Sequence, residues 1–203
     1  MAPDAALPAV PEGRLADGGW ELTDERVETV FELQRAKVTG ATALYDDART
    51  REAVESAAGL DRQWRFFFAT ALSFRPPLAP GIGPMMVLPT IRSEAGSAFA
   101  SELRDRGFEN VSRGRRERVR TDSGDRLNLR SYAAELPLDG VASTLPVTGW
   151  VGVWHADGFR IAAGAYPARP IAELLDLEDP DAPLDRAPQD YRDELLDLIR
   201  AVE

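Results

Sequence analysis

Two runs of apolar and aromatic residues that flank Ala156-Asp157-Gly158 form the strongest pattern in the chain, over residues 148–166. Each run alternates with a period of two residues, and an Asp-Gly pair between such runs is typical of a β-hairpin. Apolar side chains occupy both faces of both arms, which indicates a sheet that is covered on both sides. We therefore predict that this hairpin lies in the middle of a sheet with helices packed against it.

Three other segments have the same two-residue period. Residues 26–44 alternate through Val27, Thr29, Phe31 and Leu33, and Gly40 is interpreted as a bulge or bend before the strand resumes. Residues 62–75, RQWRFFFATALSFR, predict a strand that two prolines end. Residues 109–137 predict a second hairpin, with its turn at residues 122–125.

The sequence predicts helices in four places. Asp46 or Asp47 is expected to cap a helix that Gly59 closes, and residues 91–107 predict a second helix after a Gly- and Pro-rich loop. A short helix is expected near residues 171–177, and residues 190–202 form an amphipathic helix pattern.

This order of elements predicts one α+β domain. Residues 26–203 would form an antiparallel sheet of about five to six strands flanked by helices. Residues 1–25 are rich in Ala, Pro, Gly and Asp without a period and predict a flexible amino-terminal lead-in.

Charge adds information about the environment of the protein. The chain has 34 acidic and 24 basic residues, of which only Lys37 is a lysine, and its formal net charge is −10. Hydrated surface carboxylates keep molecules apart where salt screening is strong. Acidity with arginine in place of lysine therefore predicts a halophilic archaeon, with an acidic protein of a high-GC bacterium as the alternative. The absence of Cys excludes disulfides, thiolate metal sites and cysteine nucleophiles.

No segment approaches the roughly twenty apolar residues that span a bilayer, and no signal peptide is visible. If Met1 is the native start, the sequence predicts a cytoplasmic protein. If it is not, a removed leader or a lipid anchor is the alternative.

Element order and composition together resemble a haloarchaeal protein family of unknown function that is itself similar to the PsbP-like α/β/α sandwich. The resemblance covers about residues 25–203 and is carried by the strand WRFFFATAL, the helix that ends at Gly107, and the hairpin TGWVGVWHADGFRIAAGAYP with its trailing helix. PsbP-like domains are mostly non-catalytic accessory or binding proteins. The resemblance thus implies a binding module and brings no catalytic residues with it.

His155 is the only histidine and the centre of the enzymatic alternative, a small hydrolase or transferase that uses His155 with nearby carboxylates. A catalytic base needs a nucleophile such as Ser131 or Ser143 beside it, and nothing in the sequence spacing supports either partner. The acidic run of residues 176–185 is interpreted as a solvated surface rather than a cation site. We predict no catalytic residues, no metal site and no cofactor.

The arginines of the second hairpin form the main candidate for binding. Residues 109–130 hold seven arginines against four acidic residues, which gives +3. On a regular strand, Arg113 and Arg115 would face opposite to the other three of the first arm, which are Arg116, Arg118 and Arg120. Pairing with cross-strand carboxylates on an edge hairpin is the preferred interpretation. A site for an anionic ligand or an acidic partner is the alternative.

The absence of interleaved aromatic residues, apart from Tyr132, argues against nucleic acid. Trp154 and His155 complete the candidate binding set, although Trp64, Trp150 and Trp154 are interpreted as core residues first. The sequence predicts a non-catalytic binding or accessory module with a protein or small-molecule partner, and it does not identify that partner.

Overall fold

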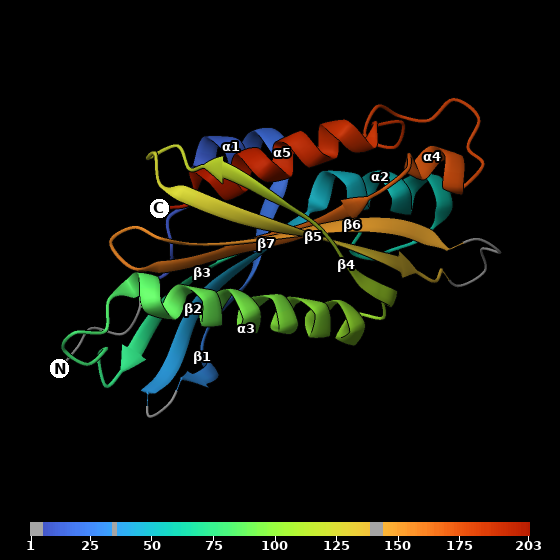
Figure 1. Cartoon of the computed structure of the whole chain (residues 1–203). Coiled ribbons are helices and arrows are strands. Elements are labelled where there is room, and N and C mark those ends of the chain that lie inside the picture. The colour runs from blue at the N-terminus through green and yellow to red at the C-terminus, as the bar shows by residue number, and fades with distance from the viewer. Residues whose placement is uncertain (1–5, 34–35, 139–143) are drawn as a thin grey trace.

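The computed structural model describes residues 6–33, 36–138 and 144–203. In these residues seven strands form one antiparallel sheet in the order β1-β2-β3-β7-β6-β5-β4 (Figure 1). The strands are β1 Trp20–Leu33, β2 Ala36–Asp47, β3 Phe66–Arg75, β4 Glu109–Arg120, β5 Arg126–Leu136, β6 Leu145–His155 and β7 Phe159–Pro167. The helices are α1 Glu12–Gly18, α2 Ala48–Ala58, α3 Pro84–Asp105, α4 Ile171–Leu174 and α5 Pro188–Ala201. The predicted α+β class is confirmed.

The β6–β7 hairpin lies in the middle of the sheet, as predicted. Val151 and Val153 point toward α3 and join one hydrophobic core, whereas Trp150 and Trp154 point toward α5 and join another. Figure 1 shows α3 on one face of the sheet and α1 with α5 on the other. Because both faces are covered, the central strands are apolar on both sides, and the tryptophans of this hairpin are buried in the core.

The sheet has more strands than the five to six predicted, because residues 26–47 are not one bent strand. β1 ends at Leu33 and β2 begins at Ala36, and the two strands pair with each other in antiparallel register. The connecting sequence carries no Gly, Pro, Asn or Asp, so it gives no turn signal that would interrupt the alternation. Gly40 lies inside β2, where an added Cβ would stand 2.9 Å from Thr70 Cγ2.

Regular structure also begins before residue 26, where the sequence placed the start of the domain. Residues 12–18 form α1, which ends at Gly19 in the left-handed conformation. Before α1, Ala9 exchanges two backbone hydrogen bonds with Glu203, so the chain ahead of this helix pairs with the carboxyl end. Because the Pro- and Gly-rich composition of residues 1–25 shows no hydrophobic period, the sequence does not predict these contacts. Residues 1–5 of the predicted lead-in lie outside the described residues.

Helix α3 begins at Pro84, seven residues before the predicted start at Ile91. Pro84 occupies the first turn, where the missing N–H of proline costs nothing, and Pro89 follows inside the helix. The Gly- and Pro-rich sequence predicts a loop at both prolines, but the structure places them in the helix, and Pro84 suits a helix start. Of the α3 residues that line the cavity described below, the added turns supply Pro89.

The remaining helices lie where the sequence predicted them, although α4 ends at Leu174, before the predicted end at Leu177. Asp47 caps α2 through a 2.9 Å hydrogen bond from the Thr50 amide, and Gly59 ends the helix in the left-handed conformation. Helix α5 buries Tyr191, Leu195 and Ile199 against the sheet.

Candidate functional site

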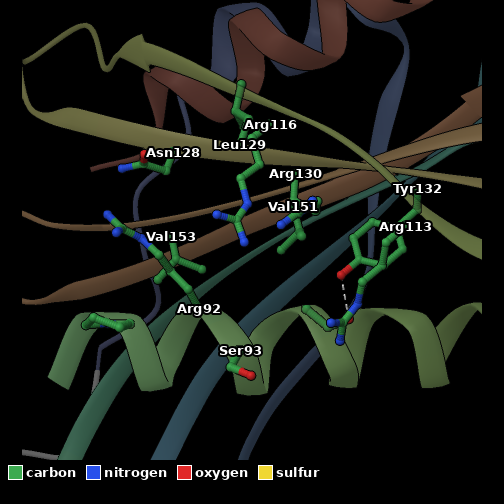
Figure 2. A pocket seen from close by; sticks show the side chains of 12 residues that line it. Arg92, Ser93, Arg113, Arg116, Asn128, Leu129, Arg130, Tyr132, Val151 and Val153 are labelled. Carbon is green, nitrogen blue, oxygen red and sulfur yellow. Dashed lines mark hydrogen bonds between the residues drawn. The ribbon is translucent and has the colours of Figure 1, made fainter.

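A cavity of about 300 Å³ lies between α3 and the strands β4, β5 and β6 (Figure 2). It is lined by Pro89, Arg92, Ser93 and Gly96 from α3, by Arg113 and Arg116 from β4, by Asn128, Leu129, Arg130 and Tyr132 from β5, and by Val151 and Val153 from β6. Arg113 and Arg116 are exposed on the edge strand, whereas Arg92 and Arg130 are partly buried. The cavity therefore opens to solvent at β4. We call it the basic cavity.

A β-bulge in β4 brings the arginines onto one face. Arg113 pairs with Tyr132 and Arg116 pairs with Arg130, so three steps along β4 match two steps along β5. This irregularity overturns the expected alternation, because Arg113 now shares the α3 face with Arg116. At Gly114, inside the bulge, a Cβ would collide with the Ser131 hydroxyl, so the bulge requires glycine there.

None of the described residues that line the basic cavity is acidic. Among the described residues, no carboxylate lies within ion-pair distance of Arg92, Arg113, Arg116 or Arg130. Arg113 instead donates to the Ser97 hydroxyl at 3.1 Å, and Arg130 donates to the Gly114 carbonyl at 3.0 Å. Neutral acceptors thus hold the side chains of Arg113 and Arg130 in place and leave their positive charges uncompensated.

Arg92 and Arg116 differ from the other two arginines because no protein acceptor binds them in the described part of the chain. The buried Nε of Arg92 has no hydrogen-bond partner there. Burial lowers the pKa of the Arg92 guanidinium, and the positive charges of Arg116 and Arg118 lower this pKa further. Figure 2 shows Arg92 extending from α3 toward the strands and Arg116 extending from β4 toward the helix.

These properties suit recognition of an anion. Guanidinium groups present several N–H donors in a fixed plane and bind carboxylate or phosphate oxygens in pairs. A bound anion would supply the missing acceptors and screen the repulsion among the arginines. The Tyr132 hydroxyl already donates to the Gly96 carbonyl at 2.9 Å, so it contributes a wall rather than a reactive group.

The other arginines of the predicted set lie elsewhere. Arg115 pairs with Glu117 at 2.7 Å and lies over the Trp150 ring, on the face of the sheet that α5 covers. Arg120 donates to the Gly124 carbonyl in the hairpin turn. Arg118 does not line the basic cavity, but its charge acts on Arg92. Of the five predicted arginines, the structure brings Arg113 and Arg116 together in the cavity.

Trp154 and His155 lie apart from the basic cavity. Trp154 is 1% exposed in the core beneath α5. The His155 ring packs edge-on against Phe159 at a centroid distance of 4.7 Å. The Ser131 hydroxyl donates to the Arg115 carbonyl, and Ser143 lies outside the described residues. Among the described residues, no hydrogen bond or ion pair joins His155 to a serine or to a carboxylate.

Sequence reasoning missed the α3 side of the basic cavity. Arg92, Ser93 and Gly96 come together because residues four apart share one face of a helix. The signal was present: Arg92 and Gly96 lie beside the buried stripe of Ile91, Ala95 and Phe99, and a glycine in mid-helix leaves space. The sequence did not reveal that this face lies opposite β4.

A second cavity of about 280 Å³ lies on the other flank of α3, beside β1, β2 and β3. Its arginines are paired with carboxylates: Arg26 binds Glu28 at 3.1 Å, and Arg106 binds Glu102 at 2.8 Å. The rest of its lining is largely apolar, including Leu44. Uncompensated positive charge therefore distinguishes the basic cavity from its neighbour.

Within the described residues, no group of three or more His, Asp or Glu side chains is arranged to hold a metal ion. No helix in the same part of the chain combines the length and the hydropathy required to cross a bilayer.

The fold and site define an antiparallel α+β protein with a basic cavity between one helix and an edge hairpin. Residues 7–203 match the family described as "Domain of unknown function (DUF6517)", and the chain belongs to that family. Comparisons with curated proteins and with solved structures find no match.

Proposed function

We propose that this protein is a non-catalytic binding module and that its ligand is an anion held in the basic cavity. The observation that carries the proposal is the pair Arg92 and Arg116, which line one cavity and have no counter-charge among the described residues.

Elsewhere in the described residues, arginines are commonly paired with carboxylates, unlike Arg92 and Arg116. Acidic residues outnumber basic ones by ten. Arg51 binds Asp46 and Asp61, Arg65 binds Asp47, and Arg192 binds Glu117. A cluster of arginines without carboxylates in such a protein indicates a site whose counter-charge comes with a ligand.

Phosphate is a suitable first probe, because it is compact and binds guanidinium groups in pairs. The melting temperature is measured in sodium phosphate and in sodium chloride at equal ionic strength. Phosphate at ten times its Kd stabilises a protein by about 1.4 kcal/mol, which corresponds to a rise in Tm of roughly 3–6 °C for a chain of this size.

Arg116→Gln is expected to abolish most of this rise. Arg115→Gln is the matched control, because Arg115 is the next residue of the same strand but lies on the opposite face. An equal loss in both variants, or no phosphate-specific rise in the wild-type protein, would overturn the proposal.

Two broader proposals accompany this one. The acid-rich, lysine-poor composition supports a salt-rich environment and a haloarchaeal source. The layered arrangement of helices and sheet supports the likeness to the PsbP-like α/β/α sandwich and an accessory role. In strong salt, contacts inside a partly buried cavity are screened less than contacts on an open surface, so an enclosed site suits such an environment.

A further inference from the structure

We infer that the ligand of the basic cavity is a phosphate monoester with a compact apolar body. This inference rests on the proposed function and names the chemical class of the anion. It follows from three features of the cavity: the number of uncompensated charges, the volume, and the chemistry of the floor.

The charges favour a dianionic head. Arg92 and Arg116 both lack an acceptor in the described residues, and Arg118 adds its field at Arg92. A carboxylate ligand brings one negative charge and would leave part of this repulsion in place. A phosphate monoester carries close to two charges above its second pKa of about 6 and has three terminal oxygens that accept from guanidinium forks.

The volume favours a head that carries a body. A cavity of about 300 Å³ corresponds to roughly ten water molecules at ~30 Å³ each. Inorganic phosphate has five non-hydrogen atoms, so it would leave much of this space to water. A monoester of a small ring fills more of the space.

The floor favours an apolar body. Val151 and Val153 form it from the central strand β6, and both are nearly fully buried. Gly96 adds no side chain from the helix, and Pro89 adds an apolar edge. The arginines thus lie on the walls and rim, whereas the base of the cavity is apolar, as in sites that bind an organic ligand by an anionic end.

Arg113 and Arg130 have a supporting role. Their hydrogen bonds to Ser97 and Gly114 hold them in place before a ligand arrives. Side chains that are already ordered lose less entropy on binding. They therefore raise the positive potential that attracts the phosphoryl group, while Arg92 and Arg116 contact that group directly.

The test compares three probes by isothermal titration calorimetry at pH 7.5 and constant ionic strength. Phenyl phosphate has the dianionic head and the ring, inorganic phosphate has the head alone, and benzoate has the ring with a single charge. We expect phenyl phosphate to bind at least tenfold more tightly than either of the others. Equal binding of phenyl phosphate and inorganic phosphate would overturn the inference and leave the proposed function intact.

Equal binding of benzoate and phenyl phosphate would also overturn it, because the dianionic head would then be unnecessary. Failure of all three probes to bind would overturn the proposed function itself.

A pair of variants locates the body of the ligand. Val153→Thr keeps the side-chain shape and makes the floor polar, so it should weaken phenyl phosphate three- to tenfold and leave inorganic phosphate unchanged. Val147→Thr is the control, because Val147 is a buried residue of the same strand that does not line the basic cavity. Equal weakening in both variants would contradict the assigned floor.

Discussion

The Tyr132 hydroxyl donates a 2.9 Å hydrogen bond to the Gly96 carbonyl and so ties β5 to α3 beside the basic cavity (Figure 2). Tyr132 is 2% exposed, and its ring packs edge-on against Phe99. A Cβ at position 96 would stand 2.6 Å from the Tyr132 oxygen, so the contact requires glycine. This pair therefore sets how closely the helix approaches the sheet.

Replacing either member of the pair is expected to destabilise the protein, and the two changes should not add. Tyr132→Phe removes one hydrogen bond and should lower the free energy of unfolding by about 1 kcal/mol. Gly96→Ala should also destabilise the wild-type protein, because the new methyl group collides with the hydroxyl. In the Tyr132→Phe background the collision is absent, and the roughly 1 kcal/mol helix preference of Ala over Gly should make Gly96→Ala neutral or stabilising. Urea unfolding of the four proteins measures this coupling, and simple additivity would contradict it.

The arginine cluster should cost stability when no ligand is bound. Arg116→Gln removes a charge that opposes Arg92 and is expected to raise the free energy of unfolding by about 0.3–1 kcal/mol at low salt. Because salt screens the repulsion, the difference between variant and wild type should shrink as sodium chloride increases. Denaturant unfolding at several salt concentrations checks this. A destabilised variant at every salt concentration would show that Arg116 has a structural partner.

Arg65 is expected to be the most sensitive charged position in the protein. It is fully buried between the rings of Trp20 and Tyr191 and donates to Asp47 at 2.5 Å and to Glu194 at 3.1 Å. Arg65→Met would leave the buried carboxylate of Asp47 and the partly buried carboxylate of Glu194 without this partner, at a cost of about 3–5 kcal/mol. Arg14→Met is the control, since Arg14 pairs with Asp122 on the surface and such pairs contribute at most about 1 kcal/mol. Similar effects of the two substitutions on thermal unfolding would contradict the prediction.

Glu194 should make stability depend on acid. Burial acts to raise the pKa of Glu194, but Arg65 and Arg186 outweigh burial and hold this pKa below its ordinary value of 4.5. A carboxyl with a lowered pKa in the folded state contributes its full stability above the ordinary value and loses it as the pH falls through the lowered one. The stability difference between wild type and Glu194→Gln should therefore be constant near neutral pH and shrink below pH 4.5. A difference that grows on acidification would contradict this sign.

The parts of the fold that the sequence predicted correctly are those where periodicity and turn chemistry agree. The β6–β7 hairpin has alternation on both arms and Asp157-Gly158 in its turn, and α2 has its cap at Asp47 and its stop at Gly59. The missed break between Leu33 and Ala36 lacks any turn residue, so local chemistry could not separate β1 from β2.

The candidate site was predictable only in part. The sequence identifies the arginines of β4 as a cluster. The face of the sheet on which each arginine lies depends on a bulge at Gly114, which the alternation of a regular strand does not predict. Arg92 is more than twenty residues from Arg116 in the chain, and only the packing of α3 against β4 and β6 brings the two to one cavity. Long-range packing of this kind leaves no local trace in the sequence.

The most direct test of the anion site is a crystal structure of the protein soaked in tungstate, an oxyanion whose metal gives a strong anomalous signal. The account predicts an anomalous peak in the basic cavity, within hydrogen-bond distance of the guanidinium groups of Arg92 and Arg116. An empty cavity in a crystal whose surface arginines carry tungstate would contradict it.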